Sequence, residues 1–402
     1  MWALAFRNLF RNHVRTLLTL SAIVLGVVGL ILSGGFIEDI FLQLREATIH
    51  SQLGHLQISM QGFSAAGQRD PYHYLVDPPA KLLEPLNGLS KVKQTLFRIN
   101  FSGLANNGHA DLPIIGDGVE PDKEASLGSA LIIKEGRQLK DTDRNGILIG
   151  KGVAHALKLK PGNSMTVLTH TPDGAMNSLD YVVVGIFQSF SKDYDDRAVR
   201  IPLTSAQELL TTTGVHTLVI ELRHSEETDH YALALKAKIP ADLETKTWFE
   251  LAEFYQKTQD LYQRQFGVLQ LIILIMVVLS VANSVNMAIQ ERIGEFGTLL
   301  ALGNTRKSVF RLVLLENAIL GLLASALGVL LGIAAAWGIS KVGIPMPPPP
   351  SSDVGYTARI VIVPNVLALA FTVGWGATVL ASLVPARRAA GLPIVEALRA
   401  NI

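Results

Sequence analysis

Four long apolar stretches constrain this chain more than any other feature of its sequence. They cover residues 17–32, 266–289, 309–339 and 360–384. A helix needs about 20 predominantly apolar residues to cross a bilayer, so each stretch is expected to form a transmembrane helix. A long polar segment, residues 38–265, separates the first stretch from the other three. The sequence therefore predicts a membrane protein with a large domain inserted between helices 1 and 2.

The composition supports this interpretation and excludes several other classes of protein. Only 17% of the residues are charged and the mean hydropathy is +0.32, whereas soluble domains carry about 25% charged residues. The formal net charge of +1 argues against a dedicated nucleic-acid-binding protein. Because the chain has no cysteine, disulfides, thiol nucleophiles and Cys-ligated metals are excluded.

The distribution of basic residues predicts the orientation. They flank the cytoplasmic ends expected for helices 1, 2 and 4: Arg7, Arg11, Arg15, Arg292, Arg306, Lys307, Arg311, Arg387, Arg388 and Arg399. The short loop between helices 3 and 4 carries only Lys341 and Arg359. Positively charged flanks stay in the cytoplasm, so both termini are predicted to be inside and residues 38–265 outside.

These patterns together give a complete organisation for the chain. It consists of a cytoplasmic interfacial helix (1–15), transmembrane helix 1 (16–38), an external α+β domain with a helical stalk (39–262), transmembrane helix 2 (263–290), a cytoplasmic loop or helix (291–307), transmembrane helix 3 (308–341), an external Pro-rich loop (342–359), transmembrane helix 4 (360–386) and a cytoplasmic tail (387–402). A cleaved signal peptide over residues 1–35 is the alternative for the N-terminus. The apolar run is long for one, and no clear small-x-small cleavage site follows.

The external domain shows short β-rich runs broken by Gly, Pro, Asn and Asp. Strands are predicted at residues 53–60, 112–116, 146–149, 164–169, 181–187, 198–201 and 218–223, and helices at 153–159, 205–211 and 226–238. Its histidines are scattered without the i, i+4 pairing of a zinc helix. We therefore predict no catalytic residue and no metal site, and expect the histidines to be exposed or hydrogen-bonded.

Small and polar residues interrupt the apolar stretches. Gly321, Ser325, Gly328 and Gly332 recur at three- and four-residue spacing, which favours close packing of helices. Asn283 and Asn286 in helix 2 are polar groups that must find partners in lipid, either on other helices or along a substrate path.

Glu316 in helix 3 is costly in a membrane unless it is paired. We expect Arg311, or an arginine from another segment, to be its partner.

The segment after helix 2 is the most specific part of the sequence. It mixes charged, small and apolar residues at helical spacing, and Thr305 can cap the following helix. The candidate functional residues here are Glu291, Arg292, Glu295, Phe296, Gly297, Leu299, Leu300, Gly303 and Lys307. One interpretation makes Phe296, Leu299 and Leu300 contacts for a partner protein. The alternative is a connector whose apolar residues pack on the chain's own helices.

This segment carries a resemblance to a known family. Residues 291–303 have the pattern E-R-x-x-E-F-G-x-L-x-A-L-G, followed by a basic residue and then L-x-E in a Gly-rich helix. Further similarity lies at the chain ends and in the external domain, at residues 7–12, 15–20, 152–154, 157–162, 183–187, 385–390, 393 and 396–399. The chain thus resembles the MacB, LolC and FtsX permeases, which are ABC transporter subunits of the mechanotransmission class.

The resemblance implies a mechanism and a set of partners. The permease would pair as a homo- or heterodimer in the bacterial inner membrane, with its α+β domain in the periplasm. A separate cytoplasmic ABC ATPase dimer would dock on the loop after helix 2. No G-x-x-x-x-G-K-[ST] motif is present, so the resemblance implies a non-enzymatic subunit without a cofactor, with ATP and Mg bound by the partner ATPase.

Several cargo assignments stay open within the resemblance. Lipoprotein or lipid-linked cargo ranks first, because the external domain is most similar to the lipoprotein-releasing branch. MacB-like export of peptides or small hydrophobic compounds, with a periplasmic adaptor or carrier, ranks second, and non-transporting mechanotransmission to a periplasmic partner ranks third. A membrane-bound receptor or peptidase could share the topology, but the docking loop and the lack of catalytic motifs argue against it.

Overall fold

The computed structural model describes residues 13–67, 70–86, 92–127, 131–189, 191–347, 355–391 and 393. The chain divides into two compact units. One contains residues 1–41, 258–346 and 357–402, and the other contains residues 42–257 and 347–356. Most of the predicted interfacial helix, the proline run after residue 347, and residues 392 and 394–402 of the predicted tail lie outside the described residues.

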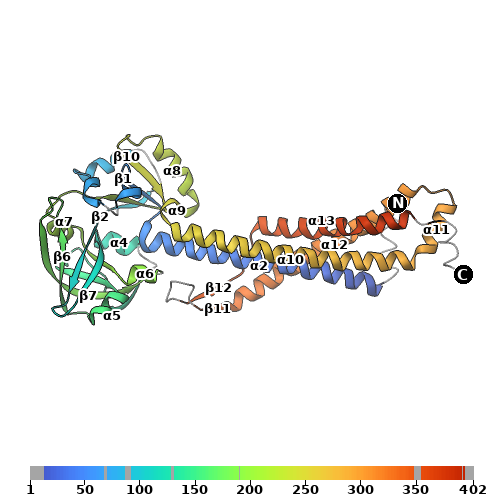
Figure 1. Ribbon diagram of the computed structural model, residues 1–402, viewed down its shortest axis with the longest axis horizontal. Helices are drawn as coiled ribbons and strands as arrows, with labels where there is room; N and C mark the ends of the chain where they lie inside the picture. Colours follow the sequence, from blue (N-terminus) through green and yellow to red (C-terminus); the bar gives the residue numbers. More distant parts are fainter. Residues whose placement is uncertain are drawn as a thin grey trace. The chain divides into compact units, whose positions relative to one another are not determined.

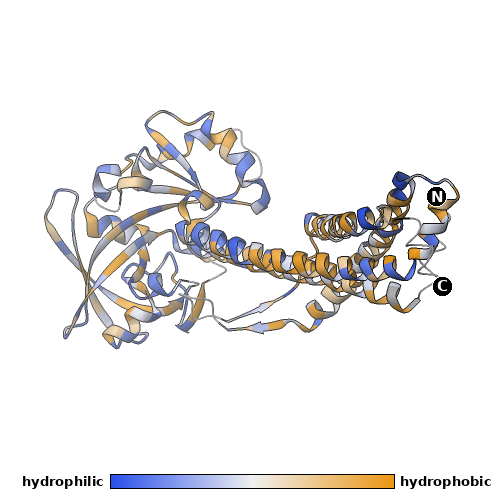
Figure 2. Cartoon of the chain, turned by 45° about the vertical axis from the view of Figure 1, so that its right-hand side comes forward, coloured by the Kyte–Doolittle hydropathy of each residue, from blue (hydrophilic) through white to orange (hydrophobic). Residues whose placement is uncertain are grey.

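Four helices in the described part of the chain are long and apolar enough to cross a membrane. They are α2 (His13–Thr48), α10 (Glu253–Glu291), α12 (Arg306–Val342) and α13 (Pro364–Ala390). Figure 2 shows hydrophobic residues along most of their length. The predicted fold class is confirmed, since a large α+β domain is inserted between the first and second of these helices.

Small residues on α12 let two other helices approach it closely. A Cβ added to Gly328 would lie 2.8 Å from Cβ of Val27, and one added to Gly332 would lie 2.7 Å from Cδ1 of Ile31, both on α2. A Cβ on Gly321 would lie 2.8 Å from Cβ of Thr378 on α13. In lipid, helix association depends on such close packing, because apolar side chains gain nothing from leaving the lipid.

The unit that contains residues 42–257, which we call the outer unit, is built on a ten-stranded sheet, as far as the described residues show (Figure 1). Its strand order is β10-β1-β9-β2-β3-β8-β5-β7-β4, with β6 paired to β2 and β7. The strands are β1 (Leu56–Met60), β2 (Val92–Asn106), β3 (Asp111–Val119), β4 (Ile132–Gly136), β5 (Gly146–Gly150), β6 (Ser164–His170), β7 (Met176–Gln188), β8 (Ala198–Pro202), β9 (Thr217–Leu222) and β10 (Leu243–Thr247). Only the β3–β8 and β5–β7 pairs are parallel among these strands.

Short helices cover the sheet and enclose two main apolar clusters. Helices α5 (Lys151–Leu157) and α7 (Leu203–Leu210) pack on the larger cluster, which includes Ile99, Val167 and Val199. Helix α8 (Thr228–Lys236) packs on the second, which includes Ile58 and Ile220. The remaining short helices are α3 (Phe63–Ala66), α4 (Pro121–Leu127), α6 (Lys192–Asp195) and α9 (Trp248–Leu251).

The last residues of α2 and the first residues of α10 belong to the outer unit. Helix α2 ends in a π-helical turn (Ile49–Leu53), and the buried guanidinium of Arg200 donates a 2.9 Å hydrogen bond from Nη2 to the carbonyl oxygen of Ser51. Helix α10 follows α9, which begins with a capping box formed by Thr247 and Glu250. The ends of α2 and α10 therefore belong to the folded outer unit.

The close approach of α12 to α2 can be tested with two glycines of the same helix. We expect Gly328→Leu to lower stability by about 1–3 kcal/mol, because its side chain would overlap Val27. Gly338→Leu is the matched control, since a Cβ there meets no atom within 4 Å. The measurement is the thermal unfolding of both variants in the same detergent. Equal melting temperatures would contradict the packing described here.

Candidate coupling site

A short amphipathic helix, α11 (Ile293–Ala301), lies between α10 and α12 in the sequence. The chain leaves helical geometry at Arg292, where φ is −112° and ψ is 16°. After α11 it turns at Gly303, whose φ of +88° lies in the left-handed region that favours glycine. Thr305 then caps α12 by accepting a hydrogen bond from the amide of Ser308. Both ends of α11 are thus set by local sequence.

Arg292 connects this helix to the membrane-spanning part of the chain. Its Nη1 lies 2.7 Å from Oε2 of Glu316 and its Nη2 lies 3.3 Å from Oε1, which makes a bidentate pair with α12. Its Nε donates to Oε2 of Glu295 on α11 at 3.0 Å. The guanidinium also lies over the ring of Phe296, 5.2 Å from its centroid.

The environment of Arg292 favours its charged form. Burial by itself lowers the pKa of Arg292, but the hydrogen bonds and negative charges of Glu316 and Glu295 outweigh burial and raise it. The structure also answers the question of what pairs with Glu316. Arg292, from the break before α11, is a partner of Glu316, while Arg311 is exposed on α12.

The structure places Phe296, Leu299 and Leu300 against the chain's own helices, as the alternative interpretation of this segment expects. Phe296 is only 1% exposed and Leu300 only 8%, and both pack in the apolar cluster formed by the long helices. Leu299 is partly buried against the same cluster. The apolar face of α11 is turned inward because it packs on Val309 and Val313 of α12 and Ala386 and Ala389 of α13. Gly297 is buried as well.

The exposed end of α11 carries a different set of residues. Leu302 is 77% exposed, and Gly303, Arg306 and Lys307 beside it are also exposed, as is Thr298 one turn earlier. We call these residues the Leu302 surface. Sequence reasoning included Gly303 and Lys307 but missed Leu302 and Arg306. The sequence signal that could have identified Leu302 is an apolar residue directly before a Gly-Asn turn.

The polar residues of α10 fall into two groups. Ser284 shares a hydrogen bond with Thr19 of α2. Asn283 is exposed and Asn286 half-buried, and no described residue forms a hydrogen bond with either side chain. No group of His, Asp or Glu in the described part of the chain is arranged to hold a metal ion.

Two family profiles together account for most of the sequence. The MacB-like periplasmic core domain matches residues 16–238, more than half of the chain, and the FtsX-like permease C-terminal domain matches residues 267–394. The chain belongs to the FtsX-like permeases with a MacB-like periplasmic core. It is therefore an ABC transporter permease of the MacB/LolC/FtsX type.

Named relatives of this permease include three different kinds of ABC transporter protein. An uncharacterized ABC transporter permease of Methanocaldococcus jannaschii is 24% identical, with 98% of this chain and 96% of the relative aligned. The lipoprotein-releasing system transmembrane protein LolC of Neisseria meningitidis is 24% identical over 63% of this chain and 64% of its own length. The macrolide export ATP-binding/permease protein MacB of Chlorobium luteolum is 26% identical over 98% of this chain and 59% of its own length.

Removal of Arg292 tests whether this residue holds α11 in place. Arg292→Met removes the bidentate hydrogen bonds that Arg292 makes to the buried Glu316, and breaking a buried pair costs about 3–5 kcal/mol. Arg311→Met removes an exposed arginine five residues before Glu316 and is the control, with an expected change within about 0.5 kcal/mol.

The readouts are thermal stability in detergent and the rate of proteolysis near α11. Faster cleavage only in Arg292→Met is expected. If both variants resist the protease as well as the wild type does, the pair with Glu316 does not position α11.

Proposed function

We propose that this permease couples ATP hydrolysis by a separate cytoplasmic ATPase to movement of its periplasmic domain, and that α11 receives the ATPase. The observation that carries this proposal is the bidentate pair between Arg292 and Glu316. A push on α11 is delivered directly to α12, because the pair joins the two helices through short, charge-assisted hydrogen bonds.

The Leu302 surface is the contact that we propose for the ATPase. Leu302 offers an apolar side chain, and Arg306 and Lys307 offer positive charge beside it. Exposed apolar residues surrounded by polar ones are typical of protein interfaces. The basic residues also fit the cytoplasmic side of the inner membrane, where positively charged loops are retained.

A second permease subunit is the proposed partner of α10. Only 17% of the most apolar part of this helix is buried, against 39% in α2. Asn283 lies on its exposed surface, and an amide in lipid is stabilised when it finds a hydrogen-bonding partner on another helix. Pairing of two permeases along α10 would supply that partner.

Lipoprotein or lipid-linked cargo is the substrate class that we propose first. Relatives named as lipoprotein-releasing proteins from several bacteria support it. MacB-like export with a periplasmic adaptor is the alternative, and the MacB relative aligned along 98% of this chain favours it.

Substitution of Leu302 tests the ATPase contact. We expect Leu302→Glu to reduce co-purification of an ATP-binding protein about tenfold or more, because the change places a carboxylate in the middle of the contact. Leu233→Glu is the matched control, since Leu233 is 70% exposed on α8 of the outer unit. Full recovery of the ATPase with Leu302→Glu would contradict the proposed docking surface.

The cargo class can be tested with the native complex in proteoliposomes. If the cargo is a lipoprotein, ATP should transfer an acylated lipoprotein from the vesicles to a soluble carrier protein added outside them, and the transferred amount should rise with hydrolysis. The control is the same complex with a non-hydrolysable ATP analogue. Accumulation of a peptide or hydrophobic compound with no lipoprotein release would favour the MacB-like alternative.

A further inference from the structure

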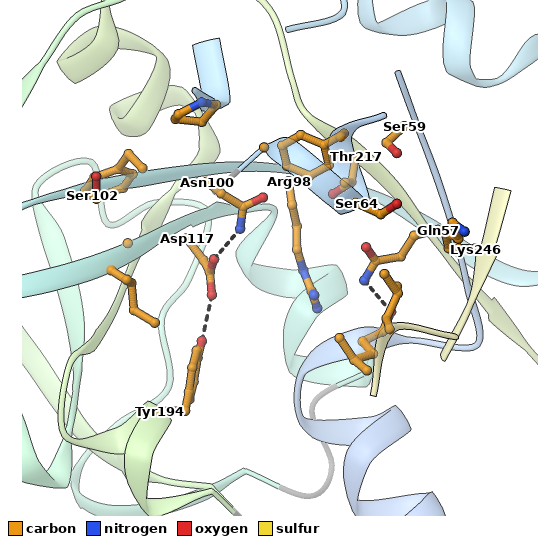
Figure 3. A pocket seen from close by; sticks show the side chains of 18 of the residues that line it. Gln57, Ser59, Ser64, Arg98, Asn100, Ser102, Asp117, Tyr194, Thr217 and Lys246 are labelled. Atoms are coloured by element: carbon orange, nitrogen blue, oxygen red, sulfur yellow. Dashed lines mark hydrogen bonds between the residues drawn. The ribbon is translucent and has the colours of Figure 1, made fainter. Parts of the chain in front are cut away.

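The outer unit contains a cavity of about 560 Å³ on one face of its sheet (Figure 3). Side chains from neighbouring strands line its floor, namely Gln57, Ser59, Arg98, Asn100, Asp117 and Thr217. The strand register explains why they share a face. Ser59 lies opposite Thr217, Thr217 opposite Arg98, and Asn100 opposite Asp117, and alternate residues of a strand point to the same side.

This polar face is unusual because part of it is buried. An antiparallel sheet commonly turns its polar face to water, but here Ser59, Arg98 and Thr217 are buried while they line a cavity. The floor of the cavity carries hydroxyl and amide groups in place of the larger apolar side chains that fill a packed core. A hollow of this size falls within the range of small-molecule and peptide sites, about 300–1,000 Å³.

The charged groups of the floor are paired with each other or with charged groups behind them. Arg98 forms a bidentate pair with Glu124, at 3.1 Å and 2.6 Å, and Nη1 of Arg200 lies 3.0 Å from the same carboxylate. Asp117 accepts hydrogen bonds from the amide of Asn100 at 2.7 Å and from the hydroxyl of Tyr194 at 2.6 Å. Burial is the main cause that raises the pKa of Tyr194, so its hydroxyl keeps the proton that it donates.

Two further cations line the cavity without an ion pair to any described residue. They are Lys246 on β10 and Arg197, which precedes β8. The lining contains one carboxylate, Asp117, and its oxygens are occupied by Asn100 and Tyr194. Glu244, beside the lining, accepts hydrogen bonds from Ser59 and Ser64 and adds negative charge near β10. The positive charge that an anionic group of a ligand can pair with is therefore local, at Lys246 and Arg197.

The mixture of groups on the lining points to a peptide. Gln57 and Asn100 each carry a donor and an acceptor, as the hydroxyls do, and a peptide backbone alternates the same two groups. A fully ionised phosphate has only acceptors, so it would leave the acceptor oxygens of Gln57 and Asn100 without a donor, whereas the N–H groups of a peptide can satisfy them. Phe63, Phe101 and Leu251 on the lining give apolar contacts for side chains. Lys246 on β10 and Asp117 on β3 are separated by four gaps between neighbouring strands, each about 4.8 Å wide. The distance across the sheet is therefore roughly 19 Å, which is the length of about six residues of an extended peptide.

We propose that this cavity binds a short, extended, acidic peptide segment, with a carboxylate of the peptide held by Lys246 and a second one within reach of Arg197. The backbone of the peptide lies across the strands, over Gln57, Ser59 and Asn100. The site lies wholly within residues 53–251 of the outer unit, so it does not depend on the ATPase contact at α11.

The test is fluorescence anisotropy with the full-length protein in detergent and a fluorescein-labelled peptide of sequence Glu-Ala-Val-Ala-Val-Glu. A peptide with glutamine at both ends serves as the uncharged comparison. We expect the acidic peptide to bind about tenfold more tightly, since charge-assisted hydrogen bonds are about twice as strong as neutral ones. Lys246→Gln should remove most of that difference, and Ser102→Trp should block both peptides by filling the cavity.

Lys134→Gln is the matched control, because Lys134 is an exposed lysine of β4 outside the cavity. It should leave binding unchanged. Equal affinity for the two peptides, no binding of the acidic peptide, or binding that survives both Lys246→Gln and Ser102→Trp would overturn the proposal. Displacement of the peptide by phosphatidylglycerol vesicles in the wild type, lost in Lys246→Gln, would also overturn it in favour of a lipid headgroup.

Discussion

The ion pair between Arg292 and Glu316 is the interaction on which the membrane unit depends most. A carboxylate within a membrane-spanning helix is costly unless it is paired and hydrogen-bonded. Arg292, which lies where α10 ends and α11 begins, supplies a bidentate partner for Glu316 on α12. The pair therefore joins the start of α11 to α12. The burial of Phe296 and Leu300 follows, because the same placement turns their face toward α12 and α13.

The sequence was sufficient for the parts of the structure that depend on hydropathy and local chain geometry. The four apolar helices are present, and each predicted strand coincides with an observed one, from β1 to β9. Strand β2 was missed although it is the longest, because Lys93, Arg98 and Asn100 interrupt its apolar pattern. Those polar residues pair with partners distant in sequence, such as Glu221 and Glu124, and such pairing cannot be read from local periodicity.

The candidate site was predictable in place but not in detail. The segment 291–307 and the demand of Glu316 for a basic partner could both be derived from residue types. Which arginine pairs with Glu316, and which face of α11 is exposed, depend on the direction that the chain takes at the break before α11. The sequence contains no periodic signal for that direction. For this reason Phe296 looked like a contact residue, whereas Leu302 at the end of the helix carries the exposed surface.

We propose that the pair between Arg292 and Glu316 transmits motion between α11 and α12, beyond holding the two helices together. A charge-exchange experiment on the stimulation of ATP hydrolysis by cargo tests it most directly. We expect Arg292→Glu and Glu316→Arg each to abolish the stimulation, and the double variant, with the charges exchanged, to restore a large part of it. If either single variant keeps full stimulation, or if a folded and inserted double variant is as uncoupled as the singles, the pair does not transmit the motion.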